Sequence, residues 1–197
     1  MKTIFIGTSN LGKVNDFKHI LSAEGIEVKS LHDLNEEIEI EESGATFEEN
    51  AKLKAETLCQ MLNQIVIADD SGLEIKALQG KPGVYSARYA GEHKNDEDNI
   101  QKVLSEMKGI PFEKREAAFV CVLAVDIPGK ETLVLEGRCN GYIAQEPKGE
   151  HGFGYDPIFY VPDKGKTMAE MSPDEKNEIS HRRRALNKLK QKATYLF

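Results

Sequence analysis

The sequence is short of cysteine, of long apolar runs and of positive charge. Its 197 residues include three cysteines, Cys59, Cys121 and Cys139, an odd number without any C-x-x-C spacing. This pattern is typical of buried thiols in a reducing compartment and provides no disulfide framework. The apolar run within residues 1–7 is far too short for a signal peptide or a membrane span. We therefore expect a soluble, cytoplasmic protein with no membrane partner.

The charge balance is acidic, with 33 Asp and Glu against 26 Lys and Arg, a formal net charge of −7. This excess argues against general affinity for the backbone of a nucleic acid, so we expect no nucleic-acid partner. The length is enough to bury roughly 70% of the unfolded surface in a core. It fits one domain, with or without two lobes, and we expect a single domain over residues 1–197.

Strand and helix patterns alternate along the chain. Strands are expected over 2–7, 26–30, 65–68, 115–127, 131–143 and 158–161. Helices are expected near 10–24, around 100–107, and after the N-caps Thr46 and Ser172, where Thr46 opens a capping box. A hairpin turn at Pro128-Gly129 interrupts the alternation, which predicts an α/β fold with a mixed sheet.

Residues 7–13, Gly-Thr-Ser-Asn-Leu-Gly-Lys, form the most informative segment. They follow an apolar strand and have the G-x4-G-K spacing of a P-loop. Val14, however, stands where a P-loop has the Ser or Thr that binds Mg²⁺. Backbone N–H groups, hydroxyls and Lys13 could still hold phosphate, but a metal ligand must come from elsewhere. The segment predicts a nucleotide site outside the P-loop NTPases.

Two adjacent carboxylates, Asp69 and Asp70, follow the strand expected over 65–68. Ligands of open α/β sheets bind just outside the carboxyl ends of strands. Neighbouring carboxylates repel each other unless a proton or a cation, usually Mg²⁺ beside phosphates, offsets them. Ser71-Gly72 would add a hydroxyl and a flexible turn. A plain turn after a strand explains these residues about equally well, and the phosphate-type loop favours the catalytic interpretation.

An acidic cluster of Glu39, Glu41 and Glu42 could supply a second metal ligand, although most acidic runs are solvated faces. Lys52 and Lys54 lie in the helix that follows, and one of them could neutralise phosphate. For Lys52, a solvated helix lysine is the simpler explanation.

Two later segments carry groups that suit a nucleobase. Residues 151–157, His-Gly-Phe-Gly-Tyr-Asp-Pro, offer aromatic faces for stacking and a carboxylate that accepts from ring N–H groups. In the last helix, Lys176, Ser180 and Arg183 are expected on one face, while His181 and Arg182 could donate to base carbonyls or phosphates. Each segment also has a structural explanation, a tight aromatic turn and a basic helical patch.

Together these motifs resemble the Ham1-like inosine/xanthosine triphosphate pyrophosphatases, which remove non-canonical purine triphosphates from the nucleotide pool. The matching segments are residues 8–13, 41–44, 46–51, 68–73, 82–89, 152–159 and 175–182. They run in order through nearly the whole chain. The resemblance implies an elongated mixed sheet with flanking helices, two lobes around an active-site cleft, and a homodimer.

The resemblance also implies a reaction, in which ITP, dITP or XTP and water give the monophosphate and pyrophosphate with Mg²⁺. The implied phosphate-binding residues are Thr8, Ser9, Asn10, Leu11, Gly12, Lys13 and Lys54. Asp70 would bind the metal and activate water, with Lys13 as the second catalytic residue, and Glu41 or its neighbour Glu42 would be the other metal ligand, of which we favour Glu41. The implied contacts to the rest of the substrate are Ser71, Phe153, Gly154, Tyr155, Asp156, Lys176, His181 and Arg182.

Selectivity would come from the 6-keto edge of the purine. Adenine would leave a buried donor such as His181 or Arg182 unpaired, which costs roughly 1–3 kcal/mol. Two alternatives stay open: a related pyrophosphatase acting on modified pyrimidine or methylated nucleotides, and a nucleotide sensor that does not hydrolyse. The segments Phe-Gly-Tyr-Asp and Ser-His-Arg argue against the first, and the intact Asp69-Asp70 pair argues against the second.

Overall fold

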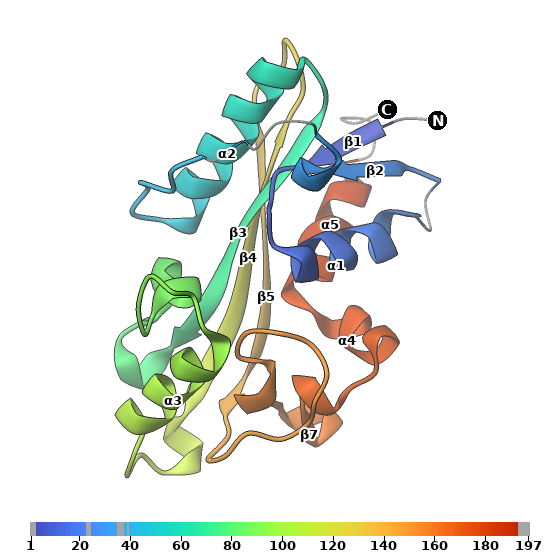
Figure 1. Cartoon of the computed structure of the whole chain (residues 1–197). Coiled ribbons are helices and arrows are strands. Elements are labelled where there is room, and N and C mark those ends of the chain that lie inside the picture. The colour runs from blue at the N-terminus through green and yellow to red at the C-terminus, as the bar shows by residue number, and fades with distance from the viewer. Residues whose placement is uncertain (1–2, 23–24, 35–37, 39, 193–197) are drawn as a thin grey trace. The chain divides into compact units, whose positions relative to one another are not determined.

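A computed structural model describes residues 3–22, 25–34, 38 and 40–192 (Figure 1). Its strands are β1 (Thr3–Ile6), β2 (Glu27–Ser30), β3 (Val66–Ile75), β4 (Glu116–Asp126), β5 (Leu133–Ile143), β6 (Phe159–Val161) and β7 (Lys166–Thr167). Its α-helices are α1 (Leu11–Ser22), α2 (Phe47–Leu62), α3 (Asp96–Glu106), α4 (Pro173–Ile179) and α5 (His181–Gln191). In the part of the chain so described, no helix combines the length and the apolar character that crossing a membrane requires.

The strands form one mixed sheet in the order β2-β1-β3-β4-β5-β6-β7. β1 pairs in parallel with β2 and β3, whereas β6 pairs antiparallel with β5 and β7. Between β4 and β5, Gly129 has a φ of 78° and Lys130 N–H donates to Ile127 O at 2.9 Å, which is a turn with Pro128 in its first central position. The predicted α/β class, mixed sheet and hairpin are confirmed.

The chain folds into two compact units. Unit 1 comprises Met1–Asp70, Cys121–Gly137 and Arg182–Phe197, and unit 2 comprises Ser71–Val120 and Arg138–His181. β3, β4 and β5 contribute residues to both units. The single domain over residues 1–197 and the cleft between two lobes stay predictions.

Unit 1 has a core built on both faces of its strands. Phe17 and Leu21 of α1 and Leu186 of α5 form one buried cluster with Ile6 and Ile67 of β1 and β3. Figure 1 shows α1 and α5 on one side of these strands and α2 on the other. The helices of unit 1 therefore cover its part of the sheet from both sides.

Gly7 allows α2 to approach the strands closely. A Cβ at this position would lie 2.8 Å from Leu58 Cδ1 and 3.1 Å from Ala68 Cβ. The first glycine of the P-loop-like segment is therefore required by helix packing.

Thr46 caps α2 as predicted, because its side chain accepts a hydrogen bond from Glu49 N–H at 3.1 Å. In the predicted capping box, the Glu49 side chain would accept from the N–H of Thr46, and here it does not. Glu49 Oε2 accepts from Ala45 N–H at 2.7 Å, one residue before the cap. The helix end is thus tied to the loop that precedes it.

Unit 2 has a separate core around the second half of β3. Leu73 and Ile75 of β3 pack with Val103 of α3, Phe119 of β4 and Phe159 of β6. This core explains why β3 continues past the end predicted at residue 68, since the buried side chains resume after the polar ones. The flexible turn predicted at Ser71-Gly72 is wrong, because both residues lie within the strand.

The last helix predicted from the sequence is interrupted at Ser180. Ser172 caps α4 with Glu175 in a capping box, as predicted. Ser180 then adopts an extended backbone (φ −60°, ψ 146°), and α5 begins at the next residue. The predicted shared face of Lys176, Ser180 and Arg183 is therefore wrong. Serine favours helix ends because its hydroxyl competes for nearby backbone groups.

Candidate active site

Asp69 and Asp70 lie in the middle of β3 rather than at its end, and both are buried. The parallel pairing of β3 with β1 extends to Ile67, and the two carboxylates follow this part of the strand. Successive side chains of a strand point to opposite faces. Asp69 therefore faces α1 and α5, whereas Asp70 faces α2. Cations lie near both carboxylates, Lys13 beside Asp69 and Lys54 beside Asp70, and their positive charge offsets the repulsion between the two aspartates.

Asp70 is held by two side chains of α2. Asn50 Nδ2 donates to Asp70 Oδ2 at 3.0 Å, and Lys54 Nζ lies 4.0 Å from Asp70 Oδ1. Burial raises the pKa of Asp70, and the positive charges of Lys54 and Lys13 and the Asn50 hydrogen bond offset only part of this effect. A carboxylate with a raised pKa is a better proton acceptor near neutral pH, as a general base requires.

Lys54 connects Asp70 to the acidic segment that precedes α2. Its Nζ donates to Glu42 Oε1 at 2.6 Å and to the main-chain oxygen of Asp69 at 2.7 Å. Burial disfavours the charged amine, but the attraction of Asp70, Asp69 and Glu42 outweighs it and raises the pKa of Lys54. Lys54 is therefore a fixed positive charge beside Asp70.

The three glutamates of the acidic cluster have different positions. Glu42 is bound by Lys54, Glu41 is exposed, and Glu39 lies outside the described residues. Within those described residues, no group of three or more His, Cys, Asp or Glu side chains is placed to hold a metal ion. The metal ligands Asp70 and Glu41 remain a prediction.

On the other face of β3, two cationic side chains lie near Asp69. Lys13 Nζ lies 3.0 Å from Asp69 Oδ2, and Arg182 Nε lies 3.7 Å from the same oxygen. Arg182 is almost fully buried, donates to Asp16 Oδ2 and lies over the ring of Phe17. The structure thus places Arg182 in unit 1 with Lys13.

The phosphate-type loop is shaped by side-chain caps at the start of α1. Thr8 Oγ1 accepts from Asn10 N–H at 3.2 Å, and Asn10 Oδ1 accepts from Lys13 N–H at 3.1 Å. Ser9 O contacts His32 Nε2 at 2.9 Å, and Leu11 is exposed. A helix N-terminus attracts anions, so this arrangement suits a phosphate group.

In unit 2, Asp156 organises the glycine-rich loop. Its Oδ2 accepts from Phe153 N–H at 3.0 Å and from Lys176 Nζ at 2.8 Å. Lys176 Nζ also lies 4.7 Å from the centre of the Phe153 ring. Gly152 has a φ of 86°, and a Cβ there would lie 2.1 Å from Asp156 Oδ2, so glycine is required twice over. The result is an aromatic ring and an ammonium group held side by side.

Two predicted base-site residues are tied into the structure of unit 2. The Tyr155 side chain is buried in the core and its hydroxyl donates to Ser86 O at 2.7 Å, and burial raises the pKa of Tyr155. The His181 ring stacks on Phe119 with centroids 5.1 Å apart. Tyr155 is therefore a scaffold for the loop, and the buried His181 ring is held against Phe119.

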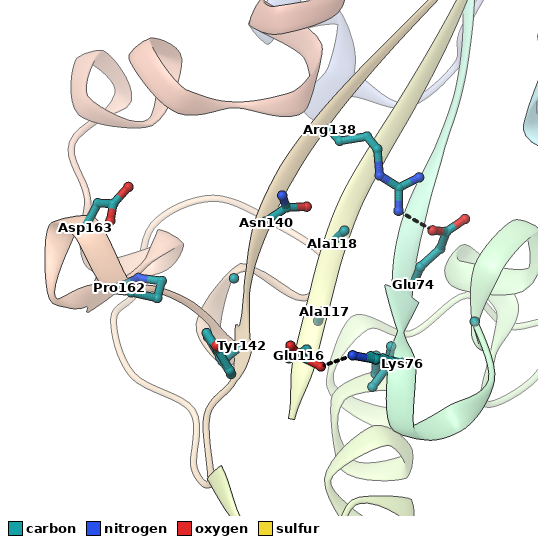
Figure 2. A pocket seen from close by; sticks show the side chains of 13 residues that line it. Glu74, Lys76, Glu116, Ala117, Ala118, Arg138, Asn140, Tyr142, Pro162 and Asp163 are labelled. Carbon is teal, nitrogen blue, oxygen red and sulfur yellow. Dashed lines mark hydrogen bonds and ion pairs between the residues drawn. The ribbon is translucent and has the colours of Figure 1, made fainter. Parts of the chain in front are cut away.

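Unit 2 also contains a cavity of about 640 Å³ along β3, β4 and β5 (Figure 2). Four of its charged groups form two ion pairs, with Arg138 Nη2 2.6 Å from Glu74 Oε2 and Lys76 Nζ 2.6 Å from Glu116 Oε2. The residues lining it include none of the predicted site residues.

The predicted residues thus divide into two groups by the unit to which they belong. The group in unit 1 comprises Thr8, Ser9, Asn10, Leu11, Gly12, Lys13, Glu41, Lys54, Asp70 and Arg182, and the group in unit 2 comprises Ser71, Phe153, Gly154, Tyr155, Asp156, Lys176 and His181. Sequence reasoning missed Asn50 and the role of Asp69 as a partner of Lys13. Asn50 could have been found, because it precedes Lys54 by four residues and so shares its helix face.

Comparisons with known proteins concern the chain as a whole. The model of the Ham1 family matches residues 4–192. Two curated relatives, both named dITP/XTP pyrophosphatase, come from Bacillus subtilis (strain 168) and Geobacillus kaustophilus (strain HTA426). The first is 62% identical and covers 96% of each chain, and the second is 58% identical and covers 96% of this chain and 93% of its own.

Two solved structures are also similar to this chain. The Staphylococcus aureus Ham1 protein is 49% identical, has a TM-score of 0.88 and covers 100% of both chains. A HAM1 protein from Coxiella burnetii is 41% identical with a TM-score of 0.87, covering 99% of this chain and 100% of its own.

Proposed function

Because the chain belongs to the Ham1 family, we propose that it hydrolyses ITP, dITP and XTP to the nucleoside monophosphate and pyrophosphate. The observation that carries this proposal is its similarity, over nearly the full length, to proteins named dITP/XTP pyrophosphatase. Removal of these triphosphates would keep deaminated purines out of the nucleotide pool. From the same resemblance we propose a cytoplasmic homodimer.

The group in unit 1 is assigned to the triphosphate. Residues 8–13 form a capped helix N-terminus, and Lys13 and Lys54 supply positive charge. In the structure Lys13 neutralises Asp69 and Lys54 binds Glu42, so both ammonium groups have partners before substrate binds. Phosphate oxygens would compete for these ammonium groups, which then offset the charge of the pyrophosphate that leaves.

The donor set of unit 1 suits Mg²⁺. This ion retains several waters and binds through one or two carboxylates together with substrate phosphates, so it does not require a cluster of three protein ligands. A dication would also relieve the unfavourable ionisation of buried Asp70. We assign Asp70 and Glu41 as the ligands, as the resemblance to the family implies; Glu41 is exposed, whereas Glu42 is bound by Lys54 before substrate arrives. When bound, Mg²⁺ polarises the phosphoryl oxygens and offsets their charge.

Asp70 is assigned as the general base. It accepts a proton from a water molecule whose oxygen attacks the α-phosphorus. The bond from the α-phosphorus to the bridging oxygen breaks, and pyrophosphate leaves with that oxygen. Asn50 and Lys54 fix the carboxylate in place, so the base is oriented before the substrate arrives.

The group in unit 2 is assigned to the purine base. Phe153 offers a ring for stacking, while Lys176 and His181 are donors that suit the O6 acceptor of hypoxanthine or xanthine. Adenine has an amino group at this position and would leave a donor unpaired, at a cost of about 1–3 kcal/mol. Asp156 holds Lys176 and the loop in position.

Pyrophosphate release from dITP, XTP, dATP, dGTP and dTTP in the presence of Mg²⁺ tests the proposal. Preference for dITP and XTP supports both the reaction and the base assignment. Equal activity across the panel retains the phosphate chemistry but contradicts the base assignment. Preference for dTTP favours the pyrimidine alternative, and the absence of hydrolysis favours a nucleotide sensor.

A further inference from the structure

Asn50 is a buried amide with both of its ends in use. It lies in α2 with 1% of its surface exposed. Its Nδ2 donates to Asp70 Oδ2 at 3.0 Å, and its Oδ1 accepts from Gly44 N–H at 2.7 Å. One side chain therefore joins the carboxylate of β3 to the loop that contains Glu41 and Glu42.

The same contact requires a glycine at position 44. A Cβ there would lie 2.6 Å from Asn50 Oδ1 and 2.7 Å from Glu49 Cβ. Gly44 is not among the glycines with a left-handed φ, so its backbone conformation does not explain the residue. The close approach of the loop to Asn50 does explain it.

We infer that Asn50 is a positioning residue that fixes the Asp70 carboxylate relative to the acidic loop, and so prepares the chain to bind a divalent cation. This inference rests on the proposed function, because it takes Asp70 and the acidic loop as the source of the cation's ligands. Asn50 cannot turn its amide without losing one of its two hydrogen bonds. The orientation of the Asp70 carboxylate and the position of Gly44 are therefore set together.

A second tether of the same loop provides the control. Glu49 Oε2 accepts from Ala45 N–H at 2.7 Å, which also ties α2 to the loop. Unlike Asn50, Glu49 is exposed, and its carboxylate bonds the loop rather than Asp70. Glu49→Ala thus weakens the loop's attachment to α2 while the contact between Asn50 and Asp70 remains.

The experiment measures Mn²⁺ binding to the nucleotide-free full-length chain by electron paramagnetic resonance, for wild type, Asn50→Ala and Glu49→Ala. Groups that orient metal ligands typically contribute 10- to 100-fold in metal affinity or activity. We expect Asn50→Ala to raise the Mn²⁺ dissociation constant by about ten-fold or more. We expect kcat for dITP to fall by a similar factor with KM within about two-fold, and Glu49→Ala to bind Mn²⁺ like wild type.

Gly44→Ala tests the same link without changing a buried side chain, since its methyl group must displace Asn50 Oδ1. It should weaken Mn²⁺ binding in the same direction. If both substitutions act through one hydrogen bond, the double variant will lose no more affinity than the more affected single variant. Thermal unfolding of each variant identifies any that fails to fold. If Asn50→Ala is unfolded, the Mn²⁺ affinity of Gly44→Ala tests the inference in its place.

Folded Asn50→Ala protein with wild-type Mn²⁺ affinity and wild-type kcat would overturn the inference. Equal losses in Glu49→Ala and Asn50→Ala would also overturn it, because loop attachment alone would then account for the effect. A wild-type chain that releases no pyrophosphate from dITP contradicts the proposed function instead. In that case the comparison of Mn²⁺ affinities still decides whether Asn50 orders the cation site.

Discussion

Two consecutive aspartates serve different partners because a strand alternates its faces. Asp69 is bound by Lys13 and lies near Arg182, whereas Asp70 is bound by Asn50 and lies near Lys54. Burial without a partner would cost each carboxylate several kcal/mol, so these cations are needed for the fold as well as for the chemistry. Burial raises the pKa of Asp70, which suits a proton acceptor. At the scale of single residues, the two faces of β3 separate the proposed base from the neighbour that holds Lys13.

Asp70→Asn should abolish turnover while nucleotide binding persists. The amide keeps the size of the side chain but cannot accept a proton from water, so we expect kcat for dITP to fall by at least about 100-fold. Isothermal titration with dITP should still detect binding through Lys13 and Lys54. Asp163→Asn, at an exposed aspartate of the cavity in Figure 2, serves as the control and should leave kcat unchanged. Full turnover by Asp70→Asn would show that another group is the base.

Glu175 makes a stability contribution that depends on pH. Its hydrogen bond with Lys166 and its capping contact with Ser172 N–H lower the pKa of Glu175 from 4.5 to about 2. A lowered folded-state pKa means that the contribution is present above about pH 4.5 and is lost as the pH falls toward 2.

Glu175→Gln should therefore lower the Tm at pH 7, and the difference from wild type should shrink as the pH falls below about 4.5. Glu178 also lies in α4 and serves as the control. Glu178→Gln removes an exposed ion pair with Lys164 and should change the Tm little at any pH. A Tm difference for Glu175→Gln that grows on acidification would contradict this account of the cap.

At the scale of elements, local signals were sufficient where neighbouring residues decide the structure. The caps Thr46 and Ser172, the Pro128-Gly129 turn and the strand and helix pattern could all be predicted, because each depends on a few residues close in sequence. The class of fold followed from their order.

The extent of β3 and the break at Ser180 could not be predicted locally. An Asp-Asp-Ser-Gly segment is typical of a turn. It can continue a buried strand only where cations lie beside its carboxylates, and here those cations are Lys13, Lys54 and Arg182. They lie up to 113 positions away along the chain, which a local pattern does not reveal. The two carboxylates could therefore be singled out from the sequence, whereas the extent of the strand that carries them could not.

The packing of α2 on β1 and β3 depends on the missing side chain of Gly7. Gly7→Ala would place a methyl group 2.8 Å from Leu58 Cδ1, and overpacking of this kind costs about 1–3 kcal/mol in the free energy of unfolding. Leu58→Ala alone should cost about 2–5 kcal/mol, since Leu58 is buried. Urea denaturation of the double variant should show less than the sum of the two losses, because the clashing atom is gone. Strict additivity would mean that Gly7 is not required by Leu58.

At the scale of the whole molecule, the chain forms two units with different chemical character. Unit 1 carries the cations and the carboxylate that suit a triphosphate, and unit 2 carries the aromatic ring and the donors that suit a base. The chain passes between the units four times, and two of these passages, Asp70-Ser71 and His181-Arg182, lie within predicted motifs. The net charge of −7 also makes these local cations, rather than the overall field, the source of affinity for a polyanion.

The proposed homodimer gives a prediction at the same scale. Light scattering coupled to size-exclusion chromatography should give a mass twice that of the chain, and the value should not change on tenfold dilution in the micromolar range. A mass equal to that of one chain would contradict the dimer while leaving the proposed reaction intact.

In the proposed reaction water attacks the α-phosphorus, even though the loop at residues 7–13 nearly matches a P-loop. Hydrolysis of dITP in ¹⁸O-labelled water, followed by mass spectrometry of the products, shows which phosphorus is attacked. We predict dIMP that carries one ¹⁸O atom and pyrophosphate that carries none. Formation of dIDP and labelled inorganic phosphate, or label in the pyrophosphate, would contradict it.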